Sequence, residues 1–288
     1  MRAHGVLTDI PEAGTSDHIC WVYDQDDASF DRAVRAFMAG GLDRGERLLC
    51  VGERVIASIS TDGDGFAGAE ALIADGALRT VTTAEAYEAA GSFIAGEQRA
   101  YYDTATREAI ADGYTGLRVV AEVSALAADP ATRPTLVQWE QLADDVIAEG
   151  GGFTAMCAYS DALPGAALAD AATVHPLVHA PAGAPPFQIF FDDHQVALTG
   201  SVDTFSADRL ARVLASSPVS GQGAVLDLGR AEFVDVAASR VIARWAQDLT
   251  ARSLPLEVRG ASPLLRRMWQ VLNLGEVAPV RFAGSSTT

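Results

Sequence analysis

Short apolar runs alternate with longer amphipathic stretches over the first 180 residues. The run Leu48 to Val51 is too short for a helix and predicts a buried strand, whereas Phe30, Val34 and Phe37 recur at helical spacing. The predicted strands are residues 19–22, 48–51, 78–81, 117–123 and 153–159, and the predicted helices are 28–40, 63–76, most of 84–111, and 136–149. Strands that alternate with helices favour an α/β fold with a mostly parallel sheet covered on both faces.

The last hundred residues follow a different order. Two strands flank a polar turn, and a helix, a strand, a helix, a strand and a last helix follow. These elements are predicted at residues 187–191, 196–202, 206–215, 224–228, 237–251, 254–258 and 263–274. The pattern predicts a second, smaller α/β layer.

A proline-rich stretch and a change of charge divide the chain at the same place. Residues 181–186 contain three prolines and show no periodicity, which is typical of a linker. Residues 1–180 carry 28 Asp and Glu against 11 Arg, whereas residues 181–288 carry ten of each. We therefore predict domains at 1–180 and 187–284, a linker at 181–186 and a disordered tail at 285–288.

All 21 residues counted as Lys or Arg are arginine. A phosphate-binding loop of the Gly-x-x-x-x-Gly-Lys type and a Schiff-base mechanism are excluded, because both need a lysine amine. The match to Gly-x-Gly-x-x-Gly at residues 63–68 follows a polar, Asp-containing stretch and is interpreted as a loop. With no Gly-x-Ser-x-Gly elbow, a serine hydrolase is also disfavoured.

The net charge of −17 lies in the first domain and disfavours direct contact with nucleic acid or a membrane surface. The simpler interpretation of this charge is an acidic coat that only keeps the chain in solution. The apolar runs are shorter than the ~18 residues of a membrane span, and Asp9 and Glu12 interrupt the start of the chain before a signal peptide could form. We expect a cytoplasmic protein whose three cysteines are reduced.

Histidine and cysteine side chains stand at both ends of the first domain. His18 and Cys20 open its first strand, and Cys157 and His175 lie in its last elements. Imidazole and thiolate groups are ligands for zinc or iron, yet a cysteine in a strand is commonly a small buried hydrophobic group. No residue is assigned as a metal ligand, and a metal site, a polar ligand pocket and a structural role all stay open.

Polar and aromatic residues near these four complete a candidate ligand pocket. The added candidates are Tyr23, Glu53, Arg118, Glu122, Trp139 and Tyr159. Glu122 lies near the carboxyl end of a predicted parallel strand, where open α/β sheets bind ligands. The alternative for Glu122 is a surface carboxylate paired with an arginine such as Arg118.

Short motifs in the first domain resemble those of a known sensory family. They are His18-Ile19-Cys20, Gly41-Leu42 with Gly45-Glu46, Gly113-Tyr114-x-Gly116-Leu117-Arg118, Glu122, Trp139-Glu140, Cys157-x-Tyr159 and His175-Pro176. This order over residues 15–180 resembles the MEDS domain, named after methanogen, methylotroph and dichloromethane-regulator proteins. The resemblance implies a RecA-like fold without a working phosphate loop, and the sensing of small ligands, hydrocarbon-derived compounds among them.

The second domain resembles the STAS domain of the anti-sigma factor antagonist type. The resemblance rests on the turn that ends at Asp203, and on the strand 225–228 followed by Phe233-Val234-Asp235. In that family a phosphorylated serine follows the aspartate, whereas Val236 stands here and has no hydroxyl. The implied partner surface is Asp203, Asp235, Val236, Ala237, Ala238 and Ser239.

Together these features predict a ligand-sensing regulatory protein without catalytic activity. Its STAS domain would bind an anti-sigma factor or a related ATP-binding regulator, and ligand occupancy would change exposure of residues 235–239 through the linker. Two alternatives stay open: a metal- or nucleotide-dependent enzyme at the N-terminal pocket, and a STAS scaffold in a larger signalling assembly. The sequence identifies neither the ligand nor any cofactor, and a homo-oligomer is not excluded.

Overall fold

The computed structural model describes residues 2–9, 18–24, 28–60, 66–87, 93–181, 183–192, 195–219, 221 and 223–283. The chain forms two compact units, one of Ala3–Ala184 and one of Met1–Arg2 with Pro185–Thr288. Residue 182 of the predicted linker and the predicted disordered tail at 285–288 lie outside the described residues.

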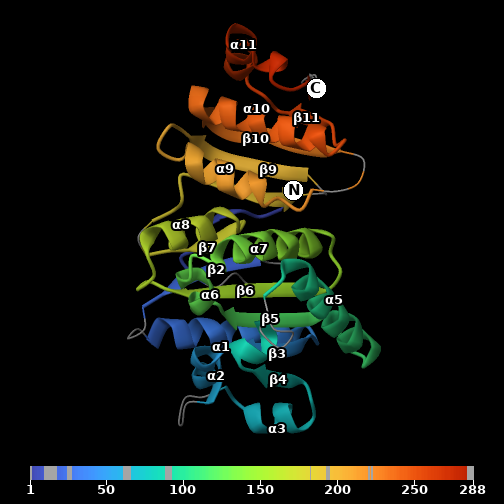
Figure 1. The fold of residues 1–288 in the computed structure, drawn as a ribbon. Coiled ribbons are helices and arrows are strands. Elements are labelled where there is room, and N and C mark those ends of the chain that lie inside the picture. Colours follow the sequence, from blue (N-terminus) through green and yellow to red (C-terminus); the bar gives the residue numbers. More distant parts are fainter. Residues whose placement is uncertain are drawn as a thin grey trace. The chain divides into compact units, whose positions relative to one another are not determined.

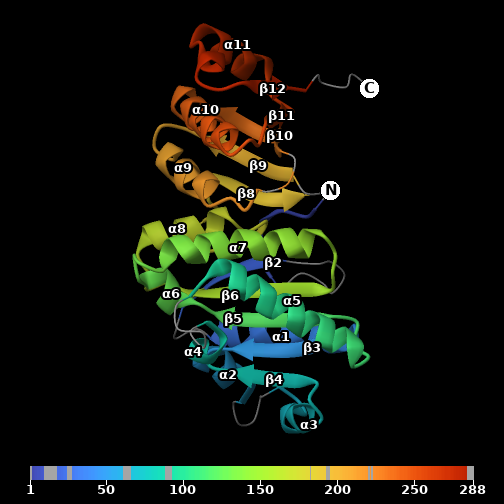
Figure 2. The same cartoon turned by 45° about the vertical axis from the view of Figure 1, so that its right-hand side comes forward.

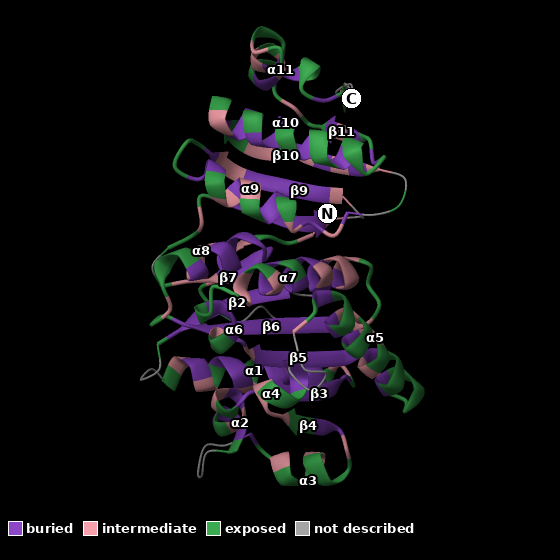
Figure 3. Cartoon of the chain, viewed as in Figure 1, coloured by how far each residue is buried: buried purple, intermediate pink, exposed green. Residues whose placement is uncertain are grey.

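The first unit contains a seven-stranded sheet in which the described pairings are all parallel. Its order is β1-β7-β2-β6-β5-β3-β4 (Figure 1). The strands are β1 Gly5–Val6, β2 His18–Tyr23, β3 Arg47–Val51, β4 Leu78–Val81, β5 Leu117–Glu122, β6 Phe153–Ser160 and β7 Leu177–His179. The central strands β5 and β6 are buried almost throughout, which fits their nearly continuous apolar sequences (Figure 3).

Helices cover both faces of this sheet (Figure 2). The helices are α1 Ala28–Asp43, α2 Glu53–Ser60, α3 Ala69–Ala74, α4 Thr83–Tyr87, α5 Ala95–Ala111, α6 Ser124–Ala128, α7 Arg133–Ala148 and α8 Gly165–Thr173. One core lies between the sheet and α4 to α8, and the other lies between the sheet and α1 and α2. Since side chains alternate along each strand, the strands β2 to β7 contribute to both cores, whereas β1 contributes to neither.

The second unit contains a five-stranded sheet of order β12-β11-β10-β9-β8. Its strands are β8 Phe187–Asp192, β9 Gln195–Val202, β10 Ala224–Val234, β11 Leu256–Arg259 and β12 Val280–Phe282. β8 and β9 are antiparallel, and the other pairs are parallel. The helices are α9 Ala207–Ala215, α10 Val236–Ala251 and α11 Pro263–Val271, followed by a 3-10 turn at Leu274–Glu276. The predicted α/β class with two layers of different size is confirmed.

Several elements differ from their predicted extents. The helix predicted over most of 84–111 is divided into α4 and α5, and the helix predicted at 63–76 is described only as α3. Gly68 adopts a left-handed conformation directly before α3, with φ of 76°. β10 runs to Val234, six residues further than predicted, because irregularities in its register accommodate the polar stretch after Leu228.

Candidate functional site

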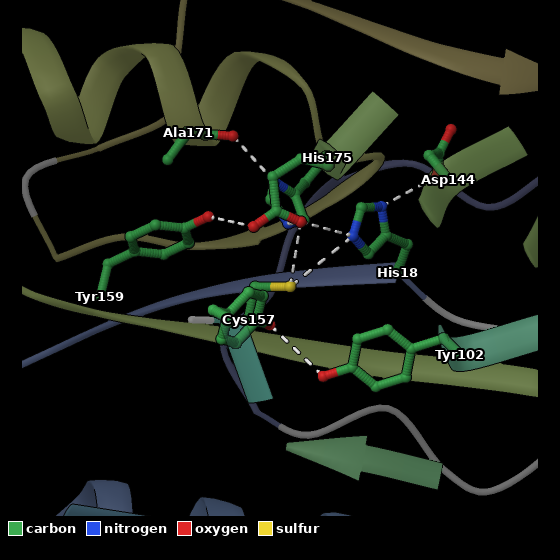
Figure 4. A network of polar contacts seen from close by, with 9 residues as sticks. His18, Tyr102, Asp144, Cys157, Tyr159, Ala171 and His175 are labelled. Atoms are coloured by element: carbon green, nitrogen blue, oxygen red, sulfur yellow. Dashed lines mark hydrogen bonds and ion pairs between the residues drawn. The ribbon is translucent and has the colours of Figure 1, made fainter. Parts of the chain in front are cut away.

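Four side chains meet on the face of the first sheet that α7 covers (Figure 4). His18 is the first residue of β2, Cys157 lies in β6, Glu140 lies in α7, and His175 follows α8. β2 and β6 are paired in parallel with Cys20 opposite Cys157, so His18 and Cys157 fall on the same face. We call His18, Glu140, Cys157 and His175 the buried cluster.

One carboxylate oxygen is the common contact of the buried cluster. Glu140 Oε2 lies 3.3 Å from His18 Nε2 and 3.5 Å from His175 Nε2. It also accepts a hydrogen bond from Cys157 Sγ at 3.1 Å, and Cys157 Sγ lies 3.8 Å from His18 Nε2. The second oxygen, Oε1, accepts a hydrogen bond of 2.6 Å from the Tyr159 hydroxyl. All these side chains are buried, so their charges are weakly screened.

Acceptors behind the two imidazoles fix the orientation of both rings. His18 Nδ1 lies 3.1 Å from Asp144 Oδ1, and His175 Nδ1 lies 2.8 Å from the backbone oxygen of Ala171. A neutral imidazole that donates through Nδ1 keeps its lone pair on Nε2. The Nε2 atoms of both rings lie within 3.5 Å of Glu140 Oε2.

Burial and ionic partners oppose each other in the buried cluster. Burial lowers the pKa of His18, but Asp144 and Glu140 outweigh it and raise that pKa above its ordinary value. Burial raises the pKa of Glu140, but His175 and His18 outweigh it and hold that pKa well below its usual range. Burial and the charge of Glu140 raise the pKa of the Cys157 thiol, whereas burial and His18 lower the pKa of His175. The arrangement favours an imidazolium at His18 beside an ionised Glu140.

Three other predicted residues share this face of the sheet. Tyr159 bonds to Glu140, as described, and Cys20 is fully buried beside Cys157. The Trp139 ring stacks on Tyr102, with ring centroids 5.2 Å apart, and so belongs to the aromatic core.

Arg118 lies on the opposite face, toward α1. Its Nε donates to Glu46 Oε2 at 2.5 Å, and its guanidinium carbon lies 4.4 Å from the Phe37 ring centroid. The alternative that Arg118 pairs with Glu122 is wrong. Four residues along a strand separate these two by roughly 13 Å, whereas Glu46, the residue before β3, lies within bonding distance of the arginine.

Tyr23, Glu122 and Glu53 lie at the carboxyl edge of the sheet instead of in the buried cluster. Glu122 Oε1 accepts hydrogen bonds from the Tyr23 hydroxyl at 3.2 Å and from the backbone nitrogen of Ser124 at 3.1 Å. Burial and the Glu122 charge raise the pKa of Tyr23. Glu53 is exposed at the first residue of α2. The ten predicted pocket residues therefore do not form one site.

The sequence prediction omitted Glu140 and Asp144 from the site. Both lie on the buried stripe of α7, which also carries Leu136 and Ile147. A carboxylate at a position that the helical period turns inward must find a partner, because an unpaired buried charge is costly. The spacing of four residues, which places Glu140 and Asp144 on the same side of a helix as Leu136, was the sequence signal that could have identified them.

The predicted partner residues of the second unit gather around the start of α10. Asp235 is the N-cap of this helix, and its Oδ1 accepts a hydrogen bond of 2.8 Å from the backbone nitrogen of Ala238. The Ser239 hydroxyl donates to the backbone oxygen of Asp235 at 2.7 Å, and Ser239 is fully buried. In the first turn of the helix Val236 is exposed and Ala237 is half-buried.

Asp203 organises the neighbouring turn between β9 and α9. Its Oδ1 accepts hydrogen bonds from the backbone nitrogens of Phe205 and Ser206 at 3.0 and 3.1 Å. The Thr204 hydroxyl donates to Asp235 Oδ2 at 2.8 Å and joins this turn to the N-terminus of α10.

Among the helices that the structure describes, none is long and apolar enough to span a bilayer.

Comparisons with known proteins identify both parts of the chain. A family model described as the MEthanogen/methylotroph, DcmR Sensory domain, or MEDS, matches residues 17–176, and one described as "Mlab, STAS domain" matches residues 187–280. No curated protein matches the sequence.

A crystal structure of the DUF1998 helicase MrfA bound to DNA and AMPPNP is 12% identical over 92% of this chain, with a TM-score of 0.29. The chain spans 39% of that structure's length. From the two family matches, the chain belongs to the MEDS family of sensory domains and carries a STAS domain after it.

Proposed function

We propose that this chain is a signalling protein that senses a small compound through its MEDS domain and binds a regulatory partner through its STAS domain. The partner is an anti-sigma factor or a related ATP-binding regulator. The family matches support a sensory part and a STAS part. The observation that carries the partner half is an exposed apolar surface at the N-terminus of α10.

We call three exposed residues near the start of α10 the apolar patch: Phe205 in the turn before α9, Phe233 near the end of β10, and Val236 at the first position of α10. Phe205 is 97% exposed, Phe233 is 47% exposed and Val236 is 37% exposed. The bond between Thr204 and Asp235 holds the turn with Phe205 next to the first residue of α10, Val236. Aromatic side chains left this open to water are typical of protein contact surfaces.

Val236 occupies the position of the serine that is phosphorylated in antagonist-type STAS domains. A phosphate there would add about −1.5 to −2 charges at a helix N-terminus. Val236 keeps the patch apolar, and the nearby Ser239 hydroxyl is buried and bonded to Asp235. Partner binding would therefore be controlled from the sensory domain and not by phosphorylation at this position.

The sensory half needs a place that a compound can reach. The buried cluster is closed, whereas Tyr23 and Glu122 meet at the carboxyl edge, where parallel sheets bind ligands. On the same face, a hollow of about 320 Å³ is lined by Trp21, Arg32 and His179, among others. This volume suits a small molecule.

The partner half is tested by measuring Kd between the full chain and each purified ATP-binding anti-sigma regulator of the source organism. Val236→Asp is expected to weaken binding by about tenfold or more, because the contact must then desolvate a charge. Val271→Asp is the matched control, since Val271 is an equally apolar valine, 73% exposed at the end of another helix, α11.

A mass measurement after incubation with ATP and the bound regulator completes the test. The natural chain is expected to stay unmodified, whereas Val236→Ser is expected to gain one phosphate. Binding to none of these regulators, or phosphate on the natural STAS domain, contradicts the proposal. Capture of other STAS proteins alone would favour a scaffold, and ATP turnover would favour the enzyme alternative.

A further inference from the structure

The buried cluster places four donor atoms around one point. The His18, Glu140, Cys157 and His175 donor atoms all lie within 4.8 Å of one another. A tetrahedral zinc ion with bonds of about 2.0 Å to nitrogen or oxygen and 2.3 Å to sulfur holds neighbouring donors roughly 3.3–3.5 Å apart. The separations of 3.1, 3.3, 3.5 and 3.8 Å differ from these values by at most about 0.4 Å.

Each histidine and the carboxylate is also supported from behind. Asp144 accepts from His18, the Ala171 carbonyl accepts from His175, and the Tyr159 hydroxyl donates to the Oε1 atom of Glu140. These contacts leave His18 Nε2, His175 Nε2 and Glu140 Oε2 directed at the shared point. Carboxylate or carbonyl groups behind a ligating histidine are a usual feature of metal sites, because they fix the tautomer and the ring orientation.

A divalent ion would match the charge of its two anionic ligands. Metal binding requires a proton-free Nε2 on each histidine and a deprotonated Cys157 Sγ, and the displaced protons pass to solvent. The Glu140 carboxylate and the Cys157 thiolate would then balance the two positive charges of the ion.

We propose that His18 Nε2, Glu140 Oε2, Cys157 Sγ and His175 Nε2 bind one divalent transition-metal ion, zinc in the first instance. Two imidazoles, one thiolate and one carboxylate favour zinc over calcium or magnesium, which prefer oxygen ligands alone. Four protein ligands in a fully buried setting leave no open coordination position, so the ion is structural. It would tie β2 and β6 to α7 and to the segment after α8. This inference does not rest on the proposed sensory or partner function.

The metal content of the full chain tests the proposal directly. Protein produced in zinc-supplemented medium is expected to retain one equivalent of zinc after gel filtration. Protein produced with cobalt is expected to show the absorption of tetrahedral Co²⁺ together with a thiolate-to-cobalt charge-transfer band. Absence of stoichiometric metal from both preparations overturns the proposal. The buried cluster would then be a network of hydrogen bonds that holds protons and no metal. A cobalt spectrum without the thiolate band overturns Cys157 as a ligand.

Three variants assign the ligands. Cys157→Ala is expected to lose the thiolate band, whereas Cys20→Ala, its neighbour across the β2–β6 pair, is expected to keep it. Asp144→Asn keeps all four ligands and is expected to weaken metal affinity by about 10 to 100-fold. Loss of the thiolate band in Cys20→Ala but not in Cys157→Ala would contradict the assignment. If Cys157→Ala does not fold, the cobalt spectrum of the natural chain and the metal affinity of Asp144→Asn still test whether the buried cluster binds metal.

Discussion

A missing side chain at Gly41 makes room for the buried Arg118. A Cβ atom on Gly41 would lie 2.7 Å from Arg118 Cδ and 2.7 Å from Leu48 Cδ2. The arginine uses this space to reach Glu46 and to lie over Phe37. Gly41, Glu46 and Arg118 therefore act together in packing. Packing alone explains why these residue types stand at three positions of the sensory motif, and no contact with a ligand is needed to explain them.

Gly41→Ala is expected to lower the free energy of unfolding by about 1–3 kcal/mol, because overpacking outweighs the better helix propensity of alanine. Gly96→Ala is the matched control, because Gly96 is also helical. Apart from its chain neighbours and the nearby backbone of α5 itself, no atom of the described residues lies within 4 Å of the place that its Cβ would take. The control is expected to gain roughly 0.5–1 kcal/mol. Urea unfolding of both variants measures the difference, and equal gains for the two would contradict the packing argument.

At the scale of elements, one carboxylate joins α1 to α2. Asp31 Oδ1 accepts hydrogen bonds from Arg54 Nη1 at 2.6 Å and from the Ser58 hydroxyl at 2.7 Å. Burial raises the pKa of Asp31, but these bonds outweigh it and hold the pKa below 3.8. About three quarters of both charged side chains is shielded from solvent, so this pair is worth more than an exposed ion pair.

Asp31→Asn is expected to cost about 1 kcal/mol of stability at neutral pH. Since the folded-state pKa lies below the unfolded value, the contribution is present above pH 3.8 and is lost as the pH falls through the folded-state pKa. Unfolding at a series of pH values should therefore show the variant and the natural chain converging in acid. Asp43→Asn, at the exposed end of α1, is expected to change stability by less than about 0.5 kcal/mol. A constant Asp31→Asn deficit at every pH would contradict the ionic origin.

Helices and strands with a clear hydrophobic periodicity could be predicted from the sequence, whereas contacts between residues on different strands of the sheet could not. The run 48–51 and the amphipathic stretch of α1 carry their period in one local segment. β1 has two residues and β7 has three, too few to show any period. The buried cluster depends on the register of β2 against β6, which no local spacing encodes.

At the scale of the molecule, each compact unit has its own apolar core. The two clusters that cover the first sheet draw their members from residues between Leu7 and Ala180. In the second unit, Leu210 on α9, Leu226 on β10 and Leu249 on α10 are fully buried. Units of this size with separate cores are expected to unfold separately.

Calorimetry of the full chain is therefore expected to resolve two transitions that single substitutions move independently. Leu210→Ala removes a fully buried side chain and is expected to destabilise the second unit by about 2–5 kcal/mol, while the transition of the first unit keeps its midpoint. Gly41→Ala is expected to lower the midpoint of the first unit's transition and to leave that of the second unit unchanged. The first unit contains Trp21 and Trp139, and the second contains Trp245 and Trp269. In a variant that keeps only one of these pairs, tryptophan fluorescence follows the unfolding of one unit and so assigns its calorimetric transition. A single transition shifted equally by both substitutions would mean that the two units fold as one, and sensing would then act through a shared folding equilibrium and not through the linker.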